Sequence, residues 1–118
     1  MNFRKYDGVL CCSGDGIVHE VINAIFHRTD REEFLNQVPI GVIPGGTSNG
    51  FAKSICETSE EECSPENCAY IVAKGQVKEV DILELETLSE EKKTYCFLGV
   101  AWGIIADIDL ESETYVMR

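Results

Sequence analysis

Two glycine-rich segments contain the side chains in this sequence that are best suited to binding or transferring a phosphate. Residues 13–16 read SGDG and residues 45–50 read GGTSNG. Glycine lets the backbone approach a phosphate closely, and an Asp in such a loop can hold Mg²⁺ or accept a proton from an attacking hydroxyl. The second segment adds backbone N–H groups and the polar side chains of residues 47–49. Together the segments predict a nucleotide site, although each alone also fits a plain strand-to-helix turn with an N-cap, Asp15 in the first.

Each glycine segment follows a short apolar run and precedes a stretch with helical periodicity. Residues 6–12 and 39–43 are the apolar runs, and both predict buried strands. Apolar side chains recur at helical spacing over residues 17–25, and a further helix starts at Phe51. Because strand, loop and helix occur twice in succession, the fold class expected is α/β with a parallel sheet. Ligands of such sheets bind at the carboxyl ends of the strands.

The middle of the chain is acidic. Residues 57–67 predict a solvated loop, and Ser64 followed by Pro65 can begin a short helix over residues 67–74. This part of the chain therefore separates the two glycine segments from the last third of the sequence.

Apolar and charged side chains alternate in the last third of the chain. Residues 77–85 and 94–101 predict two strands of an antiparallel hairpin. We therefore expect a partial α/β nucleotide-binding domain over residues 1–75. Residues 76–118 are expected to hold the first strands of a different, antiparallel sheet.

The composition restricts the class of protein. The chain has 118 residues, 44% of them hydrophobic, and a formal net charge of -11. The apolar content excludes a disordered tail, and the acidity argues against nucleic acid as a partner. No apolar run reaches the ~18 residues of a membrane helix, and no secretory signal is present. We expect a cytoplasmic protein that reaches membranes only peripherally.

Six cysteines are present, and without a secretory signal they are expected to be reduced. Cys11 and Cys12 lie in an apolar run and are predicted to be buried. Cys63 and Cys68 are separated by four residues in the acidic segment, and the chain contains no C-x-x-C pair. Because the usual spacing of zinc ligands is missing, a structural zinc site is not expected, and no metal ligands are assigned.

The sequence lacks residues that several common binding and catalytic motifs require. Phe51 stands where a P-loop has Lys, and His19 stands where a dinucleotide-binding loop has its third Gly. Asn23 replaces the second His of a zinc-protease motif. His19 is therefore interpreted as a helix-surface or interface residue rather than a ligand.

Three segments resemble sphingosine kinases, members of the diacylglycerol-kinase-like lipid kinases. Residues 13–23 (SGDGIVHEVIN) resemble their nucleotide loop and first helix, and residues 39–49 (PIGVIPGGTSN) their second glycine loop. Residues 101–113 (AWGIIADIDLESE) resemble a substrate-side segment that is more specific to sphingosine kinases. The resemblance implies a two-domain kinase with an α/β nucleotide domain and an antiparallel β domain carrying the lipid pocket.

The resemblance also implies residue roles. Asp15 would be the general base on the lipid hydroxyl, with ATP and Mg²⁺ as cofactors. The nucleotide-binding residues would be those of the two loops: Ser13, Gly14, Gly16, Gly45, Gly46, Thr47, Ser48 and Asn49. Asp109 would face the amino-alcohol head group, and Glu113 would lie near the metal or nucleotide. Without the resemblance, these last two carboxylates equally suit the edge of a solvated strand or loop.

The expected reaction is transfer of the γ-phosphoryl group of ATP to the primary hydroxyl of a sphingoid base, converting sphingosine to sphingosine 1-phosphate. A diacylglycerol or ceramide kinase is the nearest alternative. A truncated chain that binds nucleotide without catalysing transfer is the alternative from another class. The family has further units before the first loop and after residue 113, and Val116 and Met117 stand where basic residues are expected. The chain is therefore expected to be a central fragment.

Overall fold

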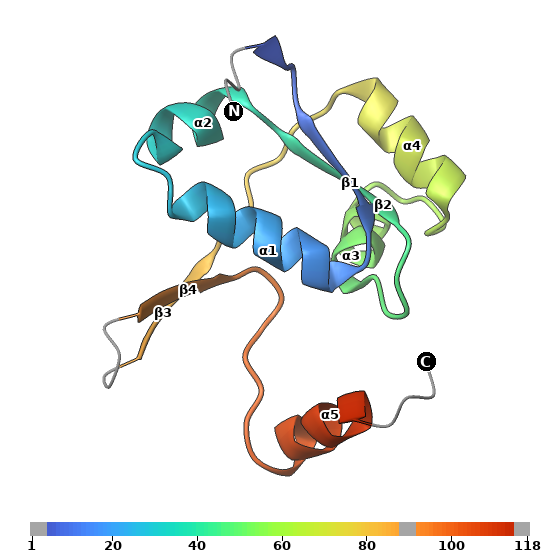
Figure 1. Cartoon of the computed structure of the whole chain (residues 1–118). Coiled ribbons are helices and arrows are strands. Elements are labelled where there is room, and N and C mark those ends of the chain that lie inside the picture. Colours follow the sequence, from blue (N-terminus) through green and yellow to red (C-terminus); the bar gives the residue numbers. More distant parts are fainter. Residues whose placement is uncertain (1–4, 88–91, 115–118) are drawn as a thin grey trace.

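The structure is a computed structural model that describes residues 5–87 and 92–114, with side chains described as far as Ser112. The observed fold is mixed α/β, as predicted, with a parallel pair of strands followed by an antiparallel pair (Figure 1). The elements are β1 (Val9–Ser13), α1 (Asp15–Phe26), α2 (Arg31–Gln37), β2 (Ile40–Pro44), α3 (Gly50–Thr58), α4 (Pro65–Lys74), β3 (Leu83–Thr87), β4 (Lys92–Cys96) and α5 (Ile104–Thr114).

The first sheet fixes where the two glycine loops begin. Strands β1 and β2 are parallel, and their register places Ser13 opposite Pro44. Both strands therefore end at the same edge of the sheet, and each is followed directly by a glycine loop. The sheet thus brings together two loops that are about thirty residues apart in the sequence, as the expected parallel pairing requires.

Helices cover this sheet and form the core. Helix α1 buries one side, through Val18, Ile22 and Ile25, and packs against β1 and β4. Helices α3 and α4 pack against β2 and against each other. The main cluster of buried side chains consists of Cys11, Val18, Ile22, Val42, Ala52, Cys56, Cys68 and Tyr95. Burial, with a smaller effect of neighbouring thiols, raises the pKa of Cys56 to about 12, so this thiol is protonated at neutral pH.

The prediction for the adjacent cysteines was half right. Cys11 is buried, whereas Cys12 is exposed. The reason is geometric: successive side chains of a strand point to opposite faces of a sheet. One face of β1 meets the core, and Leu10 and Cys12 share the other.

The short helix after the acidic segment is confirmed. The Ser64 hydroxyl accepts a hydrogen bond from the Asn67 N–H at 3.1 Å, and Pro65 is the first residue of α4. The helix ends at Gly75, whose φ of 67° lies in the left-handed region that glycine adopts readily. The acidic segment is shorter than expected because α3 continues to Thr58.

The expected hairpin is present, with shorter strands than the sequence pattern suggested. Glu84 of β3 accepts hydrogen bonds from the Lys93 ammonium at 2.6 Å and from the Tyr95 hydroxyl at 3.0 Å. These two partners, Lys93 first, lower the pKa of the Glu84 carboxyl. Both side chains of this charged pair, Lys93 and Glu84, are accessible to solvent.

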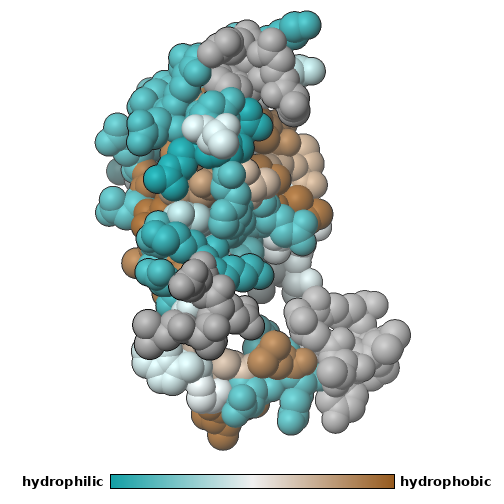
Figure 2. All heavy atoms as spheres, turned by 60° about the vertical axis from the view of Figure 1, so that its left-hand side comes forward, coloured by the Kyte–Doolittle hydropathy of each residue, from teal (hydrophilic) through white to brown (hydrophobic). Residues whose placement is uncertain are grey.

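Residues 104–114 form a helix, α5, and not the strand or loop edge that was considered for the acidic side chains there. In Figure 1, α5 stands apart from the β1–β2 sheet and its helices. Large apolar side chains are exposed on and just before it: Trp102, Ile104, Ile105, Ile108 and Leu110. Figure 2 shows such apolar surface at the lower end of the molecule. Within residues 5–87 and 92–114, no helix combines the length and apolar character needed to cross a membrane.

Candidate functional site

The two glycine loops are in direct backbone contact. The Gly45 N–H donates to the Ser13 carbonyl at 3.1 Å. A Cβ added at Gly46 would lie 2.4 Å from the Gly14 Cα, a separation that side-chain atoms do not tolerate. Glycine at position 46 is therefore required by the packing of the loops themselves, and a Cβ added at Gly14 would make a tight contact of 3.0 Å with the Gly46 Cα.

Asp15 joins the first loop to the helix after the second loop. One oxygen of its carboxylate accepts the Gly50 N–H at 2.7 Å, and the other accepts the Phe51 N–H at 3.1 Å. These N–H groups belong to the first turn of α3, where they have no partner within the helix. Asp15 thus caps α3. It is not the N-cap of its own helix, as the simpler interpretation of the first loop had it, because that position is Gly14.

This contact decides which groups remain for a phosphate. The partial positive charge at the start of α3 is already matched by the Asp15 carboxylate. The beginning of α1 and the backbone N–H groups of Thr47 and Ser48 are other groups near this edge of the sheet that could receive an anion. The N–H groups of Gly45 and Gly46 are bonded to the Ser13 carbonyl and the Asn49 side chain. The structure also explains how an Asp can sit in a phosphate-type loop: its charge is held by neighbouring N–H groups.

Asn49 shapes the second loop. Its φ of 52° lies in the left-handed region, and its side chain accepts the Gly46 N–H at 2.8 Å and donates to the Gly46 carbonyl at 2.6 Å. The amide of Asn49 is therefore engaged within the loop. Thr47 and Ser48 lie at the exposed tip between these residues.

Ser13 and Gly16 differ in accessibility. Ser13 is buried, and its hydroxyl donates to the Gly14 carbonyl at 3.1 Å. A Cβ added at Gly16, by contrast, meets no described atom within 4 Å. Gly16 is thus the glycine of the first loop that faces open space, where a ligand has room to approach the start of α1.

A shallow pocket of about 260 Å³ lies beside Asp15. Its described lining comes from the start of α1 and from the segment after β4: Asp15, Gly16, His19, Cys96, Phe97, Leu98 and Gly99. The Phe97 ring packs edge-on against Phe51 of α3 at 4.8 Å between centroids. The pocket therefore combines one carboxylate with an apolar wall, which suits an apolar molecule bearing a hydroxyl group.

His19 lines this pocket and is half-buried. Four residues further along α1, Asn23 is a positioning residue that the sequence did not reveal. Its amide donates to the Tyr95 carbonyl at 2.8 Å, and its oxygen accepts the Tyr95 N–H at 2.9 Å. Asn23 thus ties β4 to α1 and places the pocket wall that comes after β4. Asn23 shares the polar side of α1 with His19 and Glu20, so its residue type gave no signal of this role.

Asp109, the carboxylate expected to face the substrate head group, is not among the described residues that line this pocket. Asp109 is exposed on α5, and its backbone carbonyl accepts the Ser112 hydroxyl at 2.7 Å. Glu113 belongs to the same helix, and its side chain lies outside the described part of the chain. The structure therefore gathers the residues of the two glycine loops and leaves Asp109 apart from them (Figure 1).

A parallel sheet with two glycine loops at one edge fits the match to known families. The model of the diacylglycerol kinase catalytic domain family matches residues 1–85, most of the chain. The chain belongs to this family.

The chain is also similar to proteins named sphingosine kinases. The chain is 39% identical to sphingosine kinase 2 of Arabidopsis thaliana over 98% of its own length and 23% of the relative. It is 32% identical to sphingosine kinase 2 of Homo sapiens, over 98% of the chain and 18% of the relative. For sphingosine kinase 1 of Rattus norvegicus the identity is 36%, over 93% of the chain and 30% of the relative. The chain thus spans less than a third of each of these proteins.

Proposed function

We propose that the chain is the nucleotide-binding part of an ATP-dependent lipid kinase that phosphorylates the primary hydroxyl of a sphingoid base. The observation that carries the nucleotide proposal is the meeting of two glycine loops at the ends of adjacent parallel strands, with Gly16 open at the start of α1. Membership of the diacylglycerol kinase catalytic domain family supports the reaction class. The names of the relatives support a sphingoid base over diacylglycerol or ceramide.

In this proposal the loops hold the phosphates of ATP. Backbone N–H groups at the start of α1, including that of Gly16, would receive the phosphate oxygens together with those of Thr47 and Ser48. The N–H groups of Gly45 and Gly46 are bonded to Ser13 and Asn49 and would instead hold the second loop in shape. Gly14 and Gly46 would act by letting the two loops pack closely together. The side chains of Ser13 and Asn49 would shape their own loops, because each bonds to a backbone group of the loop it belongs to. The described residues thus divide into a group that shapes the loops and a group that is open to a ligand.

Asp15 would act as the general base. Each of its oxygens accepts one backbone N–H, and a carboxylate oxygen has a second lone pair that can accept the proton of a lipid hydroxyl. The fixed position of the carboxylate beside the apolar pocket supports this role. Asp15 is also the carboxylate in the described lining of the pocket. Mg²⁺ would be held beside this carboxylate by the phosphates of ATP. When bound, the ion supplies neutralisation of charge on the phosphates.

The lipid side of the proposal rests on other residues. Asp109 would pair with the cationic amine of a sphingoid base, and Glu113 would lie nearer the metal or nucleotide, once the rest of the protein positions α5. A lipid substrate requires access to a membrane surface, so we propose a cytoplasmic protein that binds membranes peripherally. A transfer assay with labelled Mg-ATP on the whole protein, against sphingosine, diacylglycerol and ceramide, tests the substrate. Label on diacylglycerol or ceramide in place of sphingosine would refute it.

The nucleotide site can be tested on this chain with two matched glycine variants. In Gly16→Ala the new methyl group meets no described protein atom, and Ala suits a helix better than Gly. Calorimetry should show Mg-ATP binding at least about tenfold weaker than in the parent, equivalent to ~1.4 kcal/mol, with no loss of thermal stability. In Gly46→Ala the methyl group collides with Gly14, so both binding and stability should fall. Unchanged binding by Gly16→Ala would contradict the proposed site.

A further inference from the structure

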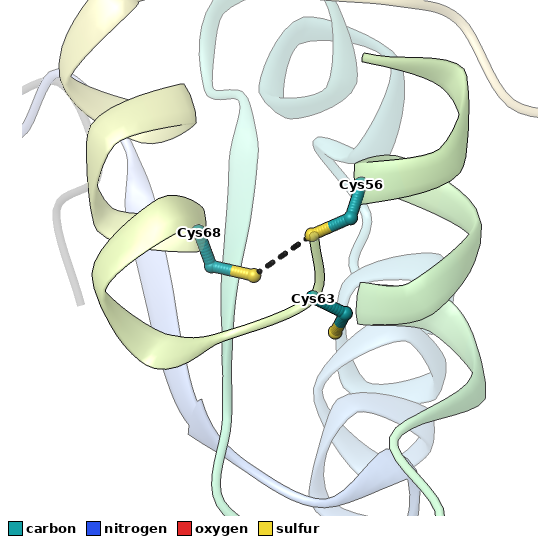
Figure 3. Close-up of side chains that lie close together, drawn as sticks. All are labelled: Cys56, Cys63 and Cys68. Atoms are coloured by element: carbon teal, nitrogen blue, oxygen red, sulfur yellow. Dashed lines mark hydrogen bonds between the residues drawn. The ribbon is translucent and has the colours of Figure 1, made fainter. Parts of the chain in front are cut away.

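Three cysteines of the middle region place their sulfur atoms together (Figure 3). Cys56 lies in α3, Cys63 in the segment between the helices, and Cys68 in α4. The Cys56 and Cys68 sulfurs are 3.3 Å apart, and all three sulfurs lie within 4.8 Å of one another. Cys56 and Cys68 are buried, at 1% and 2% exposure, whereas Cys63 is partly exposed. This cluster is separate from the glycine loops and has no role in the proposed transfer reaction.

The separations match those of a thiolate metal site. A zinc ion binds cysteine sulfur at about 2.3 Å in tetrahedral geometry, which places two such sulfurs about 3.8 Å apart. The Cys56 and Cys68 sulfurs, at 3.3 Å, are closer than this value, and the upper limit for all three pairs is 4.8 Å. Small movements of the three side chains would bring the sulfurs to the separation that one zinc ion requires.

Local hydrogen bonds hold the intervening segment in the conformation that brings the thiols together. The Glu61 N–H donates to the Cys56 carbonyl at 2.9 Å, and the Asn67 side chain donates to the Glu62 carbonyl at 2.8 Å. The Ser64 cap fixes the first turn of α4, from which Cys68 projects. The ligand positions are therefore set by the backbone. An ion would not have to order a random loop before binding.

The surroundings and the ligand type favour one class of ion. Exposed carboxylates surround the cluster along the chain, at Glu57, Glu60, Glu61, Glu62 and Glu66. Their negative potential raises the local concentration of divalent cations. Soft thiolate ligands then select zinc over Mg²⁺ and Ca²⁺, which bind oxygen ligands.

We propose that Cys56, Cys63 and Cys68 bind one zinc ion through three thiolates. As each sulfur–zinc bond forms, the thiol releases its proton to solvent. A water molecule takes the fourth tetrahedral position, on the side where Cys63 is exposed. The ion would join the end of α3 to the beginning of α4, two helices that also pack against β2. A Cys56–Cys68 disulfide is the competing state, because it would leave Cys63 as the one remaining thiol of the cluster.

Cobalt titration of the full 118-residue chain, reduced and freed of metal, tests the site directly. Co²⁺ bound by thiolates gives a sulfur-to-metal charge-transfer absorption and strong visible bands that mark tetrahedral coordination. We expect these bands to saturate at one Co²⁺ per chain and to disappear when Zn²⁺ is added. Cys63→Ser should weaken binding by about a hundredfold or more, because three ligands supply the affinity. The exposed Cys12 lies outside the cluster, so Cys12→Ser is the matched control and should bind like the parent.

A second measurement guards against a folding defect in the variant. Circular dichroism should show the same helix content in Cys63→Ser as in the parent, since the Cys63 side chain is partly exposed. In the parent, Zn²⁺ should also slow alkylation of Cys63, measured by peptide mass. Any of three results would overturn the proposal. The cobalt bands could be absent, or folded Cys63→Ser could bind cobalt as tightly as the parent. A Cys56–Cys68 disulfide could also persist in reducing buffer.

Discussion

Replacing Asp15 by Asn separates the structural role of this residue from its proposed chemical role. The Asp15 carboxylate accepts two N–H groups from the first turn of α3, at 2.7 Å and 3.1 Å. An Asn side chain has one oxygen and one NH₂ group. One of the two backbone N–H groups would therefore face another donor, and the remaining bond would lose the contribution of the negative charge.

The loss of stability can be estimated from these two bonds. Hydrogen bonds to charged groups contribute about 1.5–3 kcal/mol, and removal of a helix cap costs about 1 kcal/mol. Asp15 is partly exposed, which lowers the electrostatic part. We expect Asp15→Asn to reduce the free energy of unfolding by about 1–2 kcal/mol, and the melting temperature by roughly 5 °C for a chain of this size.

Thermal and urea unfolding of the 118-residue chain, followed by circular dichroism, measure this change. Asp81→Asn is the matched control, because Asp81 is exposed and far along the chain from the loops, so its melting temperature should not move. An unchanged melting temperature in Asp15→Asn would refute the inference that Asp15 holds α3. In the whole protein, phosphoryl transfer should be lost in Asp15→Asn well below its melting temperature. Transfer at the parent rate there would refute the general-base role and leave the capping role intact.

Asn23→Ala removes both hydrogen bonds to the Tyr95 backbone, so the free energy of unfolding should fall by about 1–3 kcal/mol and the Tyr95 amide should exchange faster. Unchanged amide exchange at Tyr95 would show that Asn23 does not hold β4. Lys93 and the Tyr95 hydroxyl lower the pKa of Glu84 in the folded protein below its ordinary value of 4.5. Their contacts with the ionised carboxylate therefore stabilise the fold at pH values above 4.5. This stabilisation is lost as the pH falls through the lower pKa of the folded state. Urea unfolding should therefore show the parent more stable than Glu84→Gln near pH 7 and the difference shrinking below about pH 4; a constant difference would contradict this.

Local features made much of the fold predictable. The order of strand, glycine loop and helix can be read from short apolar runs, glycine positions and helical spacing, which act over a few residues. The start of α4 is predictable from Ser64 and Pro65 for the same reason. The helical state of residues 104–114 was missed because its apolar and acidic residues do not separate into two clear faces, and neighbouring elements do not bury it.

The contacts that define the candidate site are long-range and were not predictable in this way. Asp15 reaches N–H groups 35 and 36 residues further along the chain, and Asn23 reaches Tyr95 across 72 residues. The cysteine cluster was missed for a related reason. Its ligands do not have the spacing of a known zinc motif, and they meet because α3 and α4 pack side by side.

The glycines of the loops show why a motif alone does not establish a site. Gly46 is required because a Cβ there would collide with the Gly14 backbone, so glycine would be needed at this position even in a loop that binds nothing. Gly16 has no such packing partner among the described atoms, so the fold gives no steric reason for glycine there. Asp15 serves both the fold and the candidate site, since the bonds that hold α3 also fix the carboxylate beside the pocket. A change in the position of α3 would therefore move the proposed base, and the cysteine cluster at the other end of α3 is one place where such a change could begin.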